Sequence, residues 1–130
     1  MTFYAHHVCL KVTDLERSQL FYREKLGFVP AAEIRHTPEV VSCFLASADG
    51  KLQLQLLHYP GIQADPAYGH LGMQVADIRQ SFAFHDSLGC VSQGIVEQPH
   101  QFGYFIKDPD GYETELCQLK EAGCPDNQKG

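Results

Sequence analysis

Basic residues are scarce in this sequence. Of its 130 residues, 10 are Lys or Arg and 16 are Asp or Glu, which gives a formal net charge of −6. The Lys and Arg residues form no cluster along the chain, whereas nucleic-acid binding depends on clustered cations that neutralise phosphates. The composition therefore argues against a nucleic-acid partner.

Long apolar runs are also missing. No stretch approaches the roughly 20 apolar residues of a membrane-spanning helix, and residues 1–6 lack the apolar core of a signal peptide. The five cysteines are an odd number without a C-x-x-C pair, so they do not suggest a disulfide framework. These absences predict a cytoplasmic protein with no membrane partner.

What is present suffices for one domain. A chain that is 44% hydrophobic and 20% charged can bury a substantial core at this length, and no low-complexity segment interrupts it. We expect a single domain over residues 1–130, with a loose tail at about 121–130 that has little to bury.

One pattern occurs twice in the chain. A histidine, a valine, an aspartate, a serine and a phenylalanine recur at one constant offset, and a Leu-Gly pair follows each set. The matched pairs are His7/His70, Val12/Val75, Asp14/Asp77, Ser18/Ser81 and Phe21/Phe84. This repetition in register predicts two copies of one supersecondary unit, each opening with a strand that carries a histidine.

The first copy, at about residues 5–58, has the pattern of a strand, a helix and three strands. Apolar and polar residues alternate from about residue 5 to 12, which predicts a half-buried strand with His7 on its less apolar face. Asp14 and Gly27 are suited to begin and end a helix. The further strands are expected at about 28–34, 40–46 and 52–57.

The second copy, at about residues 69–119, repeats this order after a linker at about 59–68. Its expected elements are a strand at 69–75, a helix capped by Asp77, and strands at 90–96, 102–107 and 112–119. The predicted class is therefore α+β: two β-α-β-β-β modules whose curled mixed sheets surround a metal cleft.

The repeated histidines suggest that metal site. Equivalent positions in two curled sheets would bring His7 and His70 to one cleft, although a lone strand histidine is more often structural. The last strands add an amide or a carboxylate; the candidates are Gln53 or Gln55 in the first module and Glu113 or Glu115 in the second. Two imidazoles, an amide oxygen and a carboxylate suit a divalent transition metal with open positions for substrate.

Several short motifs stand out along the chain: His7, Asp-Leu-Glu-Arg-Ser at 14–18, Phe-Tyr at 21–22, Leu-Gly-Phe at 26–28, Gly69-His70, Phe105, Asp-Pro-Asp-Gly at 108–111 and Glu115-Leu116. Together they resemble the vicinal oxygen chelate superfamily, which includes glyoxalase I, fosfomycin-resistance proteins, extradiol dioxygenases, methylmalonyl-CoA epimerase and bleomycin-resistance proteins. The resemblance covers about residues 5–119. It implies paired modules, commonly assembled as a homodimer, and a metal held by residues of the first and last strands.

The resemblance carries four metal ligands onto this chain: His7, Gln55, His70 and Glu115. Gln55 is preferred to Gln53 because the residues that follow it echo those that follow Glu115. The implied cofactor is a divalent ion of Ni, Co, Zn, Mn or Fe. The implied activity is that of a glyoxalase I-like lyase or isomerase, in which Glu115 abstracts a proton next to a metal-chelated carbonyl.

Other members of the superfamily supply alternatives. An extradiol-type ring-cleaving dioxygenase or a fosfomycin-resistance-like transferase needs only the two histidines and Glu115. Phe105 stands where the dioxygenases have a tyrosine, and Cys9 stands where the fosfomycin proteins have a threonine. A bleomycin-resistance-like protein would bind a small molecule without catalysis. Ala32 occupies the place of the arginine that glyoxalase I uses for glutathione.

Substrate contacts are expected near the predicted metal. The loop at 97–102 precedes the strand pair that carries Glu115 and is the best candidate for substrate selection. The assigned residues are Cys9, which could equally be inert packing, and His100, Phe102 and Tyr104. The expected partners are a small-molecule substrate and a second copy of the chain in a homodimer.

Overall fold

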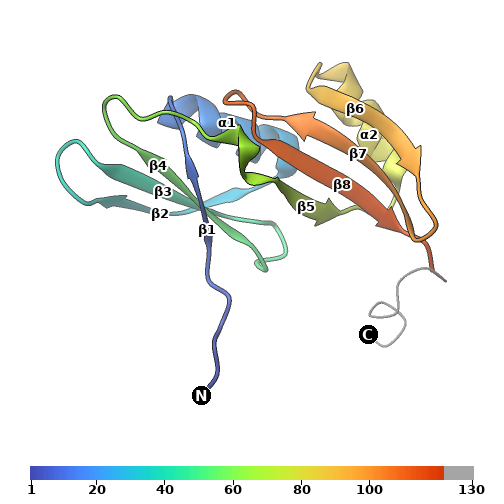
Figure 1. The fold of residues 1–130 in the computed structure, drawn as a ribbon, viewed down its shortest axis with the longest axis horizontal. Helices are drawn as coiled ribbons and strands as arrows, with labels where there is room; N and C mark the ends of the chain where they lie inside the picture. The colour runs from blue at the N-terminus through green and yellow to red at the C-terminus, as the bar shows by residue number, and fades with distance from the viewer. Residues whose placement is uncertain (122–130) are drawn as a thin grey trace. The chain divides into compact units, whose positions relative to one another are not determined.

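The first 65 residues form one compact unit of a strand, a helix and three strands. A computed structural model describes residues 1–121 of the chain, which divides into compact units at Met1–Asp65 (the first unit) and Pro66–Gly130 (the second unit) (Figure 1). The elements of the first unit are β1 (Val8–Lys11), α1 (Leu15–Leu26), β2 (Val29–Arg35), β3 (Val41–Ala46) and β4 (Gln53–His58). The strands form a mixed sheet in the order β1-β4-β3-β2, in which β1 and β4 are parallel.

The second unit repeats this order. After a short 3-10 helix, η1 (Pro66–Tyr68), it contains β5 (His70–Gln74), α2 (Ile78–Ser87), β6 (Val91–Glu97), β7 (Gln101–Lys107) and β8 (Glu113–Leu119). The sheet order β5-β8-β7-β6 matches that of the first unit, again with its first two strands parallel. The predicted α+β class with repeated β-α-β-β-β modules is confirmed. The predicted loop is shorter than expected, because β6 ends at Glu97 and β7 begins at Gln101.

Both helices begin at the predicted aspartates. The Asp14 carboxylate accepts a hydrogen bond from the backbone N–H of Arg17, and that of Asp77 accepts from the N–H groups of Arg79 and Gln80. Each aspartate thereby satisfies amides that the first helical turn leaves unpaired. Gly27 ends α1 in the left-handed conformation with φ of 69°, which glycine adopts without steric cost.

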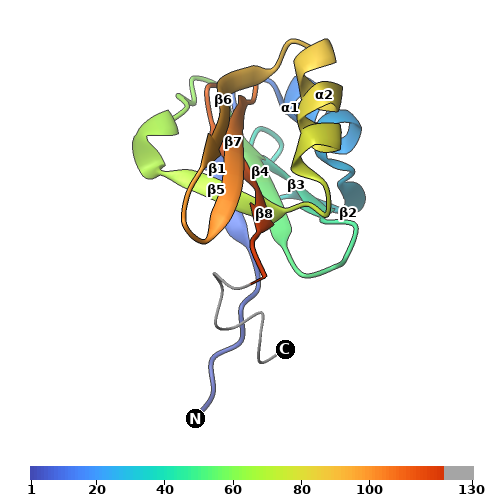
Figure 2. The ribbon, with the colours of Figure 1, turned by 90° about the vertical axis from the view of Figure 1, so that its right-hand side faces the viewer.

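Each helix covers one face of its own sheet, as Figure 2 shows for α2. Strand side chains alternate between two faces, so one face of each sheet forms a core and the other stays available. The buried apolar residues of the first unit include Leu10, Tyr22, Leu45, Leu54 and Leu56, and those of the second include Leu71, Ile78, Tyr104, Ile106 and Leu116. We call the face of each sheet away from its helix the outer face.

Two further predictions from the sequence concern the C-terminal tail and membrane spans. The predicted tail at about 121–130 falls outside the described residues from position 122 onward. Among the described residues, no helix is long and apolar enough to cross a membrane. Location in the cytoplasm stays a prediction.

Candidate metal site

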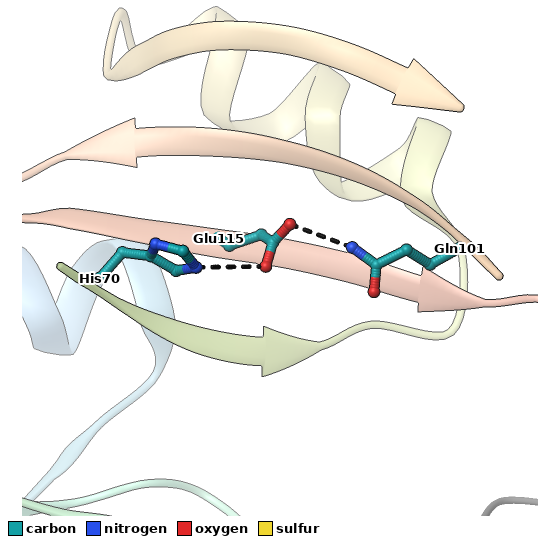
Figure 3. A network of polar contacts seen from close by, with 3 residues as sticks. All are labelled: His70, Gln101 and Glu115. Atoms are coloured by element: carbon teal, nitrogen blue, oxygen red, sulfur yellow. Dashed lines mark hydrogen bonds and ion pairs between the residues drawn. The ribbon is translucent and has the colours of Figure 1, made fainter. Parts of the chain in front are cut away.

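His70 and Glu115 come together on the outer face of the second unit. The parallel strands β5 and β8 place Gly72 directly opposite Glu115. His70 Nε2 lies 3.4 Å from Glu115 Oε1 (Figure 3). An imidazole nitrogen and a carboxylate oxygen, both ligands of divalent metals, therefore already face each other.

Two residues of the neighbouring strand β7 hold this pair. The ring of Phe105 packs edge-on against the ring of His70, with centroids 5.0 Å apart and an interplanar angle of 85°. Gln101 Nε2 donates a hydrogen bond of 3.0 Å to Glu115 Oε2 (Figure 3). The imidazole and the carboxylate thus each have a fixed neighbour on the same face.

The first unit presents a matching arrangement. His7, which directly precedes β1, packs edge-on against Phe44 at a centroid distance of 5.5 Å. Phe44 pairs with Gln55 across β3 and β4, as Phe105 pairs with Glu115 across β7 and β8. Each unit therefore carries a histidine, an aromatic ring and a polar last-strand side chain at equivalent positions of its outer face.

The amide of Gln55 is oriented by its neighbours. Gln55 Nε2 donates to Ser42 Oγ at 2.8 Å, and the hydroxyl of Ser42 lies 2.9 Å from His36 Nε2. With its amide nitrogen held by Ser42, Gln55 has its amide oxygen available for a cation. His36 thereby supports Gln55 through Ser42.

Other candidate ligands have different partners. Glu113 accepts a hydrogen bond of 2.9 Å from Ser92 at the exposed rim of the sheet. Gln53 pairs with Ala46 across the sheet on the face of Gln55. His6 Nδ1 lies 2.7 Å from His7 Nδ1, so these two ring nitrogens share a proton and one of them is an acceptor.

Two predicted substrate-binding residues lie on the wrong side of the sheet. Strand alternation in β7 directs Phe102 and Tyr104 toward α2, because Phe105 shares the face of Glu115. Tyr104 is fully buried beneath α2, where its hydroxyl donates to Ser81 at 2.9 Å and contacts His85 Nδ1 at 2.7 Å. The ring of Phe102 has the ammonium of Lys120 above it, 4.8 Å from the centroid.

The other two predicted substrate residues stay accessible. His100 is exposed in the hairpin between β6 and β7. Cys9 pairs with Gln55 across β1 and β4, on the outer face of the first unit. Partial burial raises the pKa of the Cys9 thiol, against a smaller lowering by Lys11. The raised pKa favours the neutral thiol over the reactive thiolate.

Gln101 and Gly103 were missed as site residues. Gln101 falls within the predicted loop at 97–102, where strand alternation does not apply. Extended back from Phe105, that alternation brings Gly103 and Gln101 to the face of Glu115. These residues also line a cavity of about 60 Å³ beside the carboxylate. Its lining residues are Gln93, Val96, Gln98, Gln101, Gly103, Phe105 and Glu115.

Neither unit holds a full set of ligands. Within residues 1–121, no three His, Cys, Asp or Glu side chains gather into a group that could hold a metal. Within its own unit, the structure brings His70 to Glu115, and it places His7 and Gln55 on one face of the other sheet.

Comparisons with known proteins agree with this fold. Residues 4–116 match the family model of the Glyoxalase/Bleomycin resistance protein/Dioxygenase superfamily, and the chain belongs to this superfamily. It is 32% identical over 126 residues to the lactoylglutathione lyase of Haemophilus influenzae, covering 89% of this chain and 93% of that protein. It is 28% identical to the lactoylglutathione lyase of Salmonella typhimurium, covering 90% and 93% of the two chains.

Solved structures show the same architecture. A glyoxalase family protein of Enterococcus faecalis superposes with a TM-score of 0.74 at 27% identity, over 88% of this chain and 96% of that one. TnmS3, an antibiotic binding protein from Streptomyces, superposes with a TM-score of 0.73 at 22% identity, over 92% and 100%. The second likeness concerns the fold alone.

Proposed function

We propose that this protein is a metal-dependent lyase or isomerase of the glyoxalase I type, with one divalent ion held by His7, Gln55, His70 and Glu115. The observation that carries the proposal is the facing pair of His70 and Glu115, whose positions are matched in the first unit by His7 and Gln55. The identity of the ion among Ni, Co, Zn, Mn and Fe is left to experiment.

The residues fit such an ion. Nitrogen and oxygen ligands lie at about 2.0–2.2 Å from zinc, so two adjacent ligand atoms are separated by about 3.0–3.5 Å. The 3.4 Å between His70 Nε2 and Glu115 Oε1 agrees with this spacing. Gln55 contributes an oxygen because Ser42 holds its amide nitrogen. Two imidazoles, one amide and one carboxylate form a set common to Ni, Co, Zn, Mn and Fe.

Glu115 is the proposed base. A bound divalent cation supplies Lewis-acid polarisation of a chelated carbonyl, which acidifies the adjacent carbon-bound proton. In this mechanism Glu115 accepts that proton and returns it to the neighbouring carbon. Phe105 packs beside His70 and lines the cavity at Glu115, so it limits water around the proton while the carboxylate holds it.

The proposed substrate is an α-hydroxycarbonyl or a hemithioacetal-like adduct that offers two adjacent oxygens. Relatives at 28–32% identity are named lactoylglutathione lyase, which supports this chemical class. Ala32 lies in β2 beside a cavity of about 390 Å³ in the first unit. A thiol carrier bound there would lack the arginine contact that glutathione has in glyoxalase I.

Metal content tests the proposal directly. The wild type and His70→Ala are loaded with Ni, Co, Mn, Fe or Zn, and metal is counted by mass spectrometry on the folded proteins. We expect one ion per chain in the wild type and loss of binding in His70→Ala. Equal occupancy in a folded His70→Ala would remove His70 from the site. A wild type that stays metal-free after every reconstitution would overturn the enzyme and favour a binding protein.

The type of reaction is tested separately. The loaded wild type is expected to isomerise a 2-oxoaldehyde adduct without consuming oxygen, and to incorporate some solvent deuterium at the abstracted position. Oxygen uptake with Fe(II) and a catechol, combined with no proton exchange on any adduct, would instead identify a ring-cleaving dioxygenase.

We also propose that two copies of the chain form a homodimer. β2 is an edge strand of its sheet and is exposed at every residue, and such an edge presents unpaired backbone groups to a partner. Sedimentation at micromolar concentration is expected to give twice the mass of the chain. A monomer that binds metal and turns over substrate would contradict the dimer.

A further inference from the structure

We propose that Gln101 is a positioning residue that holds Glu115 in the orientation needed for metal binding and proton transfer. This inference rests on the proposed function above. It assigns a role to a side chain that is neither a ligand nor a base, and it gives a reason for the glycine at position 103.

The geometry divides the two oxygens of Glu115 between two neighbours. Oε2 accepts the 3.0 Å hydrogen bond from Gln101 Nε2, and Oε1 lies 3.4 Å from His70 Nε2. Figure 3 shows the carboxylate between the imidazole on one side and the amide on the other. Because Gln101 holds Oε2, the oxygen that faces His70 is the one available to a cation or a proton.

Burial makes this hydrogen bond specific. Gln101 is only 9% exposed, although most glutamines lie at the surface. A buried side-chain amide is costly unless its polar atoms are paired. The pairing of Gln101 with Glu115 therefore supports both residues, and it restricts rotation of the carboxylate about its last torsion.

Gly103 provides the space for this contact. It lies between Gln101 and Phe105 in sequence, on the same outer face. A Cβ built at Gly103 would lie 3.1 Å from Glu115 Oε2 and 3.3 Å from Gln101 Nε2. Gly103 is not among the glycines with positive φ, so the backbone does not demand a glycine here. A Cβ would instead crowd the hydrogen bond that passes over this glycine.

In the first unit, a different residue holds the last-strand side chain in place. Ser42 occupies the position equivalent to Gly103, two residues before the paired phenylalanine, and its hydroxyl holds the amide of Gln55. In the second unit the equivalent side chain is absent, and Gln101 reaches over the gap from two residues earlier. Both units thus hold the last-strand residue from the adjacent strand.

Loss of the Gln101 side chain should have the effect expected for a residue that hydrogen-bonds to a metal ligand. Such hydrogen bonds orient the ligand, and removing one typically costs about 10–100-fold in metal affinity or activity. Gln101 carries no charge at any pH in the working range, so its contribution is geometric. Without it, Glu115 can turn so that both oxygens approach the cation or both face water.

The test uses Gln101→Met, which keeps the length of the side chain and removes its donor. Gln98→Met is the matched control, because Gln98 lines the same cavity and the structure shows no bond from its side chain to Glu115. Co(II) affinity by titration and the visible absorption of the bound Co(II) are measured for both variants and the wild type. Thermal unfolding of the metal-free proteins establishes that each is folded.

We expect Gln101→Met to weaken Co(II) binding by about 10–100-fold and to change the Co(II) absorption bands. Gln98→Met should match the wild type in both measurements. Gly103→Ala retains the Gln101 amide but crowds its hydrogen bond to Glu115. It should shift the Co(II) absorption bands in the same direction as Gln101→Met. It is the decisive variant if Gln101→Met does not fold.

The outcomes separate this inference from the proposed function. A wild type that binds Co(II), together with a folded Gln101→Met of equal affinity and unchanged absorption, overturns the positioning role and leaves the metal site intact. A Gly103→Ala spectrum identical to that of the wild type overturns it as well. Failure of the wild type to bind any of the five metals overturns the proposed function, and this inference with it.

Discussion

The two units of this chain agree on their outer faces and differ beneath their helices. On the outer face, His7 and Phe44 of the first unit correspond to His70 and Phe105 of the second, with similar ring contacts. Among the proposed ligands, the last-strand residue changes from the amide of Gln55 to the carboxylate of Glu115. The positions of the proposed ligands are therefore repeated in the two units, and the last-strand ligands differ in charge.

The cores differ in which element carries the buried tyrosine. In the first unit, Tyr22 on the helix lies on the same face of the sheet as Cys43 of the strand, and both are buried. At the equivalent places the second unit has His85 on the helix and Tyr104 on the strand. The buried phenol therefore lies on the helix in the first unit and on the strand in the second.

The place of the tyrosine goes together with a difference at the buried helix serine. The Tyr104 hydroxyl donates to Ser81 in the second unit. The equivalent Ser18 is buried in the first unit, and its hydroxyl has no hydrogen-bond partner among the described residues. The same serine is thus satisfied in one copy and unsatisfied in the other, because its partner depends on what the strand provides.

The largest effect is expected from the last-strand ligand, which is Gln55 in the first unit and Glu115 in the second. Glu115→Gln should lower kcat/KM by about 10²–10⁴-fold, because it removes the only carboxylate among the proposed ligands and with it the base. Gln55→Glu, the converse change in the first unit, leaves that base in place and should cost less. Steady-state kinetics with deuterium incorporation measures both variants. Equal losses in the two variants with metal retained would contradict the assignment of the base to the second unit.

A smaller effect is expected from the two buried serines. Ser81→Ala should lower the free energy of unfolding by about 1–3 kcal/mol, because the buried hydroxyl of Tyr104 loses its acceptor. Ser18→Ala should be neutral or stabilising, since it removes a buried hydroxyl without a partner. Both serines lie in helices, so the gain in helix propensity is common to the two changes. Urea unfolding of the metal-free proteins measures the difference, and equal costs would contradict the contrast between the cores.

The smallest effect concerns alkaline pH. Burial raises the pKa of Tyr104 above its ordinary value of 10.0, against a lowering by the hydrogen bond to Ser81. The unfolded chain ionises this phenol first, so the stability it supports is complete below about pH 10 and is lost as the pH rises above that value. Tyr104→Phe should therefore show a shallower loss of stability above pH 10 than the wild type. Stability is measured by urea unfolding at each pH. If the wild type and Tyr104→Phe lose stability in parallel above pH 10, the pKa of Tyr104 does not differ between the folded and unfolded chain.

Much of the fold was predictable because its signals are local. The aspartates at positions 14 and 77 begin helices as predicted, and Gly27 ends the first one. Alternation located the strands to within a few residues. The predicted face of His70 and Glu115 also agrees with the structure, since both lie on the outer face and contact each other.

β7 shows where this reasoning stopped. Aromatic side chains occur on both of its faces, Phe105 on the outer one and Tyr104 on the inner one, so apolar alternation did not show which face was buried. Tyr104 was predicted to contact the substrate, and it is buried on the inner face. Gln101 was assigned to a loop, although the strand begins at that residue.

By itself, the sequence determined the repeat, the caps, the order of elements and the equivalence of His7 with His70, because these depend on residues close together in the chain. The tertiary structure decided which side chains meet across strands. Gln101 reaches Glu115 over a separation of 14 residues, and that contact depends on the register of β7 against β8 and on the space above Gly103. A change of one residue in register would turn either side chain to the opposite face, and no local pattern records that choice.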